Sequence, residues 1–153
     1  MRVIVVLAIV CLTGYATTAV TQQAPTKPKH ARQHAATGIK LADVAGTWTM
    51  ESMVKTAAGN DTTVTSELVA TANRKGWVTS LAGRDPIPTR IVAMGGDSIV
   101  VRAGPFQSVV RAGQKVTTRE TLHFKGDDVS GTIEARYANG SVVKGSVKGT
   151  RKK

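Results

Sequence analysis

Glu120 is the side chain whose type and position are best suited to chemistry. It lies in an alternating run over residues 115–125, on the same face as Val116, Leu122 and Phe124. Apolar residues on one face of a strand point into the core, so the pattern predicts that Glu120 points inward. A buried carboxylate is costly unless it is paired. Glu120 therefore either orients a ligand in a cavity or pairs with an internal arginine, and a register error of one residue would place it outside.

Trp77 and Tyr137 are the aromatic candidates for contact with such a ligand. A strand tryptophan either stacks on a ligand at the mouth of a barrel or packs in the core. Tyr137 belongs to an inward set with Gly131, Ile133 and Ala135. Small residues on this wall either leave space for a ligand or relieve crowding where strands bend.

Other chemistry has little support. The one cysteine, Cys11, lies in the N-terminal apolar run, so a mature chain would have neither thiol catalysis nor thiolate metal sites. His30 and His34 lack further metal ligands, and His123 has no evident nucleophile or carboxylate partner. We therefore expect a non-enzymatic protein that uses no metal and no cofactor.

The chain divides into three segments. Residues 1–19 combine Arg2 with an apolar run too short to span a bilayer, which predicts a cleaved signal peptide and a secreted or periplasmic protein. Residues 20–40 contain several basic residues and prolines but no acidic residue, as expected of a flexible linker. Residues 41–153 form the expected single domain.

The domain alternates between apolar and polar positions, with glycine-containing turns about every ten residues. Eight strands are expected, near residues 47–55, 64–70, 77–81, 90–94, 98–102, 115–125, 129–137 and 141–151. Gly104-Pro105 should interrupt the fifth, with extended structure resuming over 106–111. A proline-containing loop is expected at residues 83–88, and no helix is expected. Short turns between successive strands predict an all-β, antiparallel up-and-down meander, and closure into a barrel would remove its free edges.

Two short motifs at the ends of this domain resemble those of calycins, the lipocalin-like and avidin-like barrels. The first strand opens with Gly46-Thr47-Trp48, and the last ends with a basic residue, Arg151. The domain is also similar to small secreted bacterial proteins with the same glycine-aspartate turns. The calycin resemblance implies that Gly46, Trp48 and Arg151 close one barrel end, with the arginine stacked on the tryptophan ring. It also implies a small apolar or amphiphilic ligand inside the barrel.

The charge balance suggests a different kind of partner. The 153 residues carry a formal net charge of +11, which favours contact with anionic surfaces. Aromatic residues make up only 4% of the chain, too few for base stacking, and with the export signal this argues against nucleic acid. The alternative function is thus a filled barrel that binds anionic envelope surfaces through its basic linker and its tail, residues 148–153.

Overall fold

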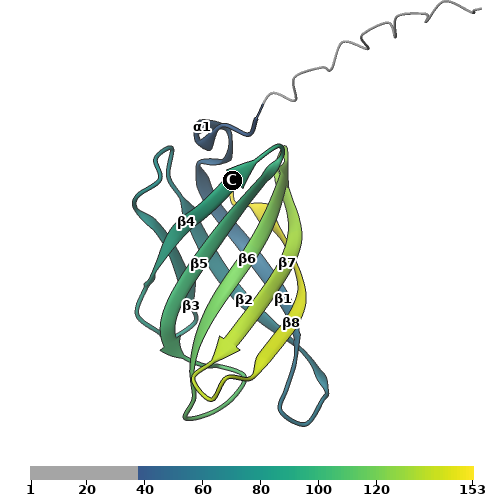
Figure 1. The fold of residues 1–153 in the computed structure, drawn as a ribbon. Coiled ribbons are helices and arrows are strands. Elements are labelled where there is room, and N and C mark those ends of the chain that lie inside the picture. The colour runs from purple at the N-terminus through teal and green to yellow at the C-terminus, as the bar shows by residue number, and fades with distance from the viewer. Residues whose placement is uncertain (1–37) are drawn as a thin grey trace, which may run out of the picture. The chain divides into compact units, whose positions relative to one another are not determined.

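The protein is an eight-stranded antiparallel β-barrel, closed by pairing of its first and last strands (Figure 1). The computed structural model describes residues 38–153. Its strands are β1 (Gly46–Lys55), β2 (Asp61–Ala70), β3 (Trp77–Leu81), β4 (Ile87–Gly95), β5 (Ser98–Gln107), β6 (Lys115–Lys125), β7 (Asp128–Tyr137) and β8 (Val142–Arg151). The predicted closed meander is confirmed. The predicted signal peptide, and the linker up to residue 37, lie outside the described residues.

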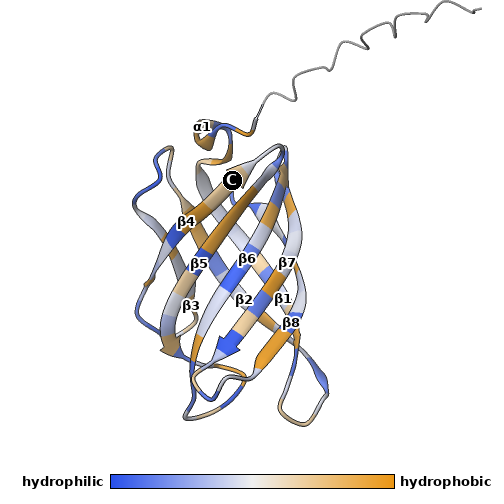
Figure 2. Cartoon of the chain, in the orientation of Figure 1, coloured by the Kyte–Doolittle hydropathy of each residue, from blue (hydrophilic) through white to orange (hydrophobic). Residues whose placement is uncertain are grey.

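The alternating apolar and polar residues of the sequence correspond to the inner and outer faces of the barrel wall. In β1, Trp48, Met50, Ser52 and Val54 are buried, whereas the residues between them are at least partly exposed. Since neighbouring residues of a strand point to opposite faces, each strand presents one set to the interior and one to solvent. Figure 2 shows the resulting mixture of apolar and polar positions along every strand.

Two local elements differ from the expectation. A one-turn helix, α1 (Leu41–Val44), precedes β1, where no helix was expected. Its formation depends on tertiary contacts, because Val44 is buried and its carbonyl accepts a hydrogen bond from the Trp48 indole. No helix within residues 38–153 is long and apolar enough to cross a membrane.

The second difference is Pro88, which was expected in a loop and lies within β4, opposite Val78. Proline removes a donor from a strand ladder. The β3–β4 ladder is short, covering only residues 77–79 of β3, and Pro88 is exposed on the outer face. A missing N–H is therefore tolerated at this place.

The two ends of the barrel are built differently. We call the end that carries α1 the floor and the opposite end the mouth; the floor is the upper end in Figure 1. The largest fully buried side chains all belong to one cluster that fills the floor half: Trp48, Met50, Trp77, Ile99 and Leu122. The mouth half holds two smaller clusters, around Leu81 and Val116. The packing therefore leaves any interior space in the mouth half.

Candidate functional site: a cavity lined by Glu120

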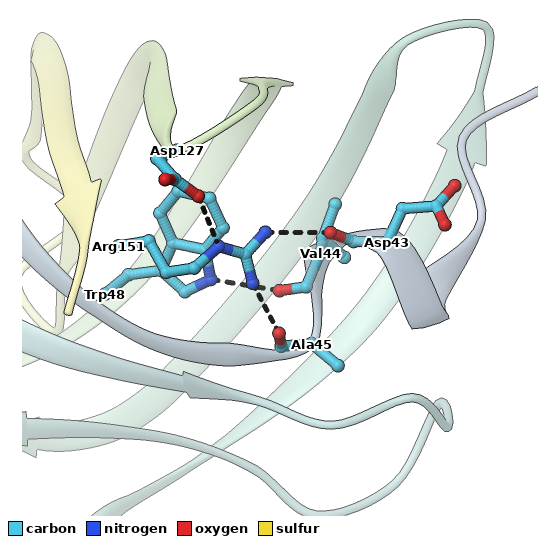
Figure 3. A network of polar contacts seen from close by, with 6 residues as sticks. All are labelled: Asp43, Val44, Ala45, Trp48, Asp127 and Arg151. Carbon is cyan, nitrogen blue, oxygen red and sulfur yellow. Dashed lines mark hydrogen bonds and ion pairs between the residues drawn. The ribbon is translucent and has the colours of Figure 1, made fainter. Parts of the chain in front are cut away.

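The floor is closed by the contact between Trp48 and Arg151. The guanidinium carbon of Arg151 lies 4.3 Å from the centroid of the Trp48 ring, and Trp48 is fully buried. Arg151 also donates to the Asp43 carbonyl at 2.8 Å and to the Ala45 carbonyl, and its Nε donates to the Asp127 carboxylate at 3.0 Å (Figure 3). The arrangement predicted for this pair is present in the structure.

Gly46 has a structural reason to be glycine. Its φ is +147°, and a Cβ there would lie 2.9 Å from Nη1 of Arg151. A side chain at this position would be strained and would also displace the guanidinium from its place beside Ala45. The glycine of the Gly-x-Trp opening is therefore explained by the Arg151 guanidinium, which packs against it from the last strand.

A cavity occupies the mouth half of the barrel. Its volume is about 60 Å³, and it opens to solvent at the mouth. Its wall comes from β1, β2, β3, β5, β6 and β7 and is predominantly apolar. A water molecule needs about 10–15 Å³ of such volume, so the cavity admits about four or five non-hydrogen atoms. This is smaller than the cup of a barrel that holds drug-sized ligands, typically about 300 Å³ or more.

Glu120 lies on the wall of this cavity. Its neighbours across the sheet are Val101 on β5 and Ile133 on β7. Protein atoms surround the side chain, yet it retains some accessible surface, which is consistent with exposure to the cavity rather than to bulk solvent. Burial raises the pKa of the Glu120 carboxyl from 4.5 to about 7.

No side chain of residues 38–153 pairs with Glu120. The ion pairs formed by the described carboxylates involve other residues, and none of the hydrogen bonds includes the Glu120 carboxyl. The predicted inward orientation fits the structure, whereas the alternative of an internal arginine partner does not. The carboxyl thus keeps its hydrogen-bonding capacity for something inside the cavity.

Hydroxyl groups make up the rest of the polar wall. They belong to Ser52, Ser66, Thr79, Ser108, Thr118 and Tyr137. Thr79 shares a hydrogen bond of 2.8 Å with Thr89. In the described part of the chain, no lysine, arginine or histidine lines the cavity. Its polar character is therefore that of one carboxyl, several hydroxyls and no cation.

The segment between β5 and β6, residues 108–114, lies at the mouth; we call it the mouth segment. Val109 and Val110 contribute to the cavity wall. Ser108 holds the turn, since its Oγ accepts from the backbone N–H of Val110 at 3.1 Å and of Arg111 at 2.9 Å. The segment is further closed by the Ser108 N–H, which donates to the Gln114 carbonyl at 2.8 Å.

Arg111 connects the mouth segment to β7 and to the loop after it. Its guanidinium carbon lies 4.3 Å from the centroid of the Tyr137 ring, and its Nη1 donates to Ser141 Oγ at 2.8 Å. Tyr137 lines the cavity as well, so it has one contact with the mouth segment and one with the interior. Each end of the barrel thus has an arginine stacked on an aromatic ring.

Of the three predicted ligand-contacting residues, the structure brings two together. Glu120 and Tyr137 share the cavity, but Trp77 does not line it. Trp77 is 1% exposed in the floor cluster, and its indole donates to the carbonyls of Thr71 and Asn73. The prediction that Trp77 contacts a ligand is corrected, because this residue lies at the opposite end of the barrel from the cavity.

The glycines of β7 and β8 do not create the cavity. A Cβ on Gly131 would meet the Thr121 carbonyl, one on Gly145 the Met53 carbonyl, and one on Gly149 the Thr49 carbonyl. These positions allow close approach of neighbouring strands, which was one of the two interpretations of the small-residue wall. None of the three glycines lines the cavity.

The described surface carboxylates and His123 form neither a metal site nor an extension of the cavity. Within residues 38–153, no group of three or more His, Cys, Asp or Glu side chains could hold a metal ion. His123, for which the sequence showed no partner, lies 3.2 Å from the Asp97 carboxylate on the surface. Both side chains are well exposed, and the pair does not reach the cavity.

Known proteins provide no relative from which a function could be inferred, so the proposed function rests on the fold and the cavity. No family model, curated protein or solved structure matches this chain. The barrel is compatible with a calycin-like fold, as its closed meander shows.

Sequence reasoning missed the mouth segment and its anchor. Residues 106–111 were expected to resume extended structure, whereas β5 ends at Gln107. The signal that could have marked a turn is Ser108, whose hydroxyl commonly caps backbone N–H groups two and three residues ahead.

Proposed function

We propose that this protein is a non-enzymatic binding protein that holds a small amphiphilic ligand in the mouth half of its barrel. The observation that supports this most is the Glu120 carboxyl, which faces a mainly apolar cavity without a protein partner among the described residues. A buried polar group without a partner costs free energy, and a ligand group that bonds to it would recover that cost.

The size of the cavity restricts the ligand. Only about four or five non-hydrogen atoms fit in the enclosed part, so the proposed ligand is small or extends out between the mouth loops. With the predicted signal peptide, the proposed setting is the periplasm or the extracellular space. A scavenger or carrier of small molecules fits this combination.

The test is native mass spectrometry of the purified protein, followed by NMR titration with short-chain alcohols. We expect either a retained small molecule or chemical-shift changes confined to cavity residues. The variant Ala135→Leu, which fills the cavity wall, should abolish them, whereas Ala112→Leu in the exposed mouth segment should not. Absence of both retained mass and shift changes in the wild-type protein would rule out the proposal.

The alternative function, binding to an anionic envelope surface, is favoured by a feature of the outer wall. Arg90, Arg102 and Arg119 lie directly opposite one another on β4, β5 and β6, and all three are exposed. Like charges in opposed positions destabilise a sheet. None of the three makes an ion pair or side-chain hydrogen bond within residues 38–153. The two arginine–arginine pairs therefore cost stability, although Arg119 also lies opposite Glu134 on β7. The three guanidinium groups remain available to an anion.

The basic tail contributes less to this alternative than expected. Arg151 is engaged with Trp48 and Asp127, and Lys152 pairs with Glu67. The decisive experiment is sedimentation with anionic phosphatidylglycerol vesicles at low and high salt. Arg102→Glu should weaken binding more than Lys115→Glu, which changes the net charge equally on another part of the surface. Equal weakening by the two variants would remove the row from the proposal.

A further inference from the structure

We propose that the ligand bound in the cavity is a small organic cation, a primary amine with a short apolar body, whose ammonium group bonds to Glu120. This inference rests on the proposed function and specifies its ligand. It follows from the chemistry of the cavity wall, taken residue by residue.

The charges that face the cavity are strongly asymmetric. Among residues 38–153, Glu120 and Tyr137 are the titratable residues on its wall, and no basic side chain lines it. An anionic ligand would thus meet a carboxyl and no counter-charge, whereas a cation would meet its natural partner. Arg111 does not line the cavity; its guanidinium is stacked on the Tyr137 ring and donates to Ser141.

The hydroxyl groups complete a site for an ammonium ion. An ammonium carries three N–H donors, and one carboxyl satisfies only part of them. Thr118 lies two residues before Glu120 on the same face of β6, and Ser52 and Ser66 contribute further hydroxyl oxygens to the same wall. Hydroxyls accept as well as donate, so they suit the remaining donors of the ammonium.

The apolar part of the ligand would lie toward the mouth. Val54, Leu81, Phe106, Val109 and Val116 form the apolar wall in that half. The enclosed volume admits about four or five non-hydrogen atoms, which corresponds to an amine with a chain of three or four carbons. Tyr137 and the mouth segment border the site at the entrance.

Binding of the cation would also change the protonation of Glu120. Burial alone holds the pKa of this carboxyl at about 7, so it is partly protonated at neutral pH in the empty cavity. An adjacent ammonium favours the charged carboxylate and lowers that pKa. Amine binding should therefore release a fraction of a proton at pH 7 and strengthen toward pH 8.

The experiment compares three probes of matched length on the full domain at pH 8: n-butylammonium, 1-butanol and butyrate. NMR titration of the wild-type protein should give the amine an affinity about tenfold to a hundredfold above that of the alcohol, with butyrate weakest. The carbon-13 shift of the Glu120 carboxyl should titrate at a lower pH when the amine is bound.

Two variants distinguish the contribution of the Glu120 carboxyl to binding from that of the apolar cavity wall. Glu120→Gln should remove the preference for the amine while leaving butanol binding in place, and Glu134→Gln, a carboxyl on the outer wall, should change neither. If butanol and the amine bind equally to the wild-type protein, the inference of an amine ligand is overturned, whereas the proposal that the cavity binds a small ligand stands. If none of the three probes binds, the proposed function fails as well. The wild-type comparison decides the matter even where Glu120→Gln does not fold.

Discussion

At the residue scale, Glu120 places an ionisable group where water does not solvate it. Its carboxyl faces the cavity, and burial raises its pKa from 4.5 to about 7. Such a group binds a proton more tightly in the folded protein than in the unfolded chain. The free energy of unfolding must therefore depend on pH through this one residue.

The first prediction concerns that dependence. Between about pH 4.5 and pH 7 the unfolded chain loses the Glu120 proton while the folded protein keeps it, so the free energy of unfolding falls as pH rises. The total fall is about 3 kcal/mol, and the contribution is constant above the folded pKa.

Urea unfolding of the wild-type protein and of Glu120→Gln, at several pH values from 4 to 8.5, measures this effect. The contributions of the other titrating groups largely cancel in the difference. We expect the two proteins to have similar stability at pH 4 and the variant to be more stable above pH 7. A difference that does not change with pH would mean that the Glu120 carboxyl is solvated.

The second prediction concerns Arg151. This residue combines a contact with the Trp48 ring, two backbone carbonyl partners and the Asp127 carboxylate. Lysine keeps the charge but lacks the planar fork of donors, so Arg151→Lys should lower the free energy of unfolding by about 1–3 kcal/mol.

Lys148→Ala provides the control. Lys148 lies on the same strand in an exposed ion pair with Glu51, and its loss should cost less than about 0.5 kcal/mol. Thermal or urea unfolding compares the two variants directly. Equal effects would show that the floor contact does not contribute more than an ordinary surface pair.

At the scale of the elements, close approach between neighbouring strands depends on glycines. A Cβ on Gly131 of β7 would meet the carbonyl of Thr121 and the Cα of Leu122 on β6. Backbone atoms cannot move aside as a flexible side chain can. The strands would have to separate along a ladder that joins all of β7 to β6.

The third prediction follows from this contact. Gly131→Ala should lower the free energy of unfolding by about 1–3 kcal/mol through overpacking. Gly95→Ala in β4 is the matched control, because a Cβ there meets nothing within 4 Å. It should be neutral or slightly stabilising. Urea unfolding measures both, and a neutral Gly131→Ala would mean that β6 and β7 separate at little cost.

At the scale of the whole molecule, β8 has two roles. It pairs with β7 along most of its length and with β1 from Ser146 to Arg151, so it removes the edges that an open meander would expose. The floor contact of Arg151 lies at its end. Closure of the barrel and burial of Trp48 are therefore achieved by the same few residues.

The fourth prediction tests this dependence. A chain that ends after Lys148 lacks the part of β8 that pairs with Trp48, Thr49 and Met50. We expect it to lose the near-ultraviolet circular dichroism of buried tryptophan and to self-associate through the exposed edge of β1. A chain that ends after Lys152 should behave as the full protein. A monomeric shortened chain with native dichroism would contradict this role of β8.

The sequence alone determined those features that depend on local pattern. Alternation with a period of two, interrupted by glycine turns, specified eight strands and their inner and outer faces. It also predicted the inward orientation of Glu120. The resemblance of Gly46, Trp48 and Arg151 to the calycin motifs predicted the floor contact. In the structure, pairing of the first and last strands brings these residues together.

Only the tertiary structure decided how deep each inward residue lies along the barrel axis. Alternation states which face a residue occupies, whereas its level depends on the register and tilt of neighbouring strands. Trp77 and Tyr137 both point inward, yet one fills the floor and the other lines the cavity at the mouth. No side chain of residues 38–153 pairs with Glu120, and this too is a property of the packing, since it depends on which strands bring which side chains to that level.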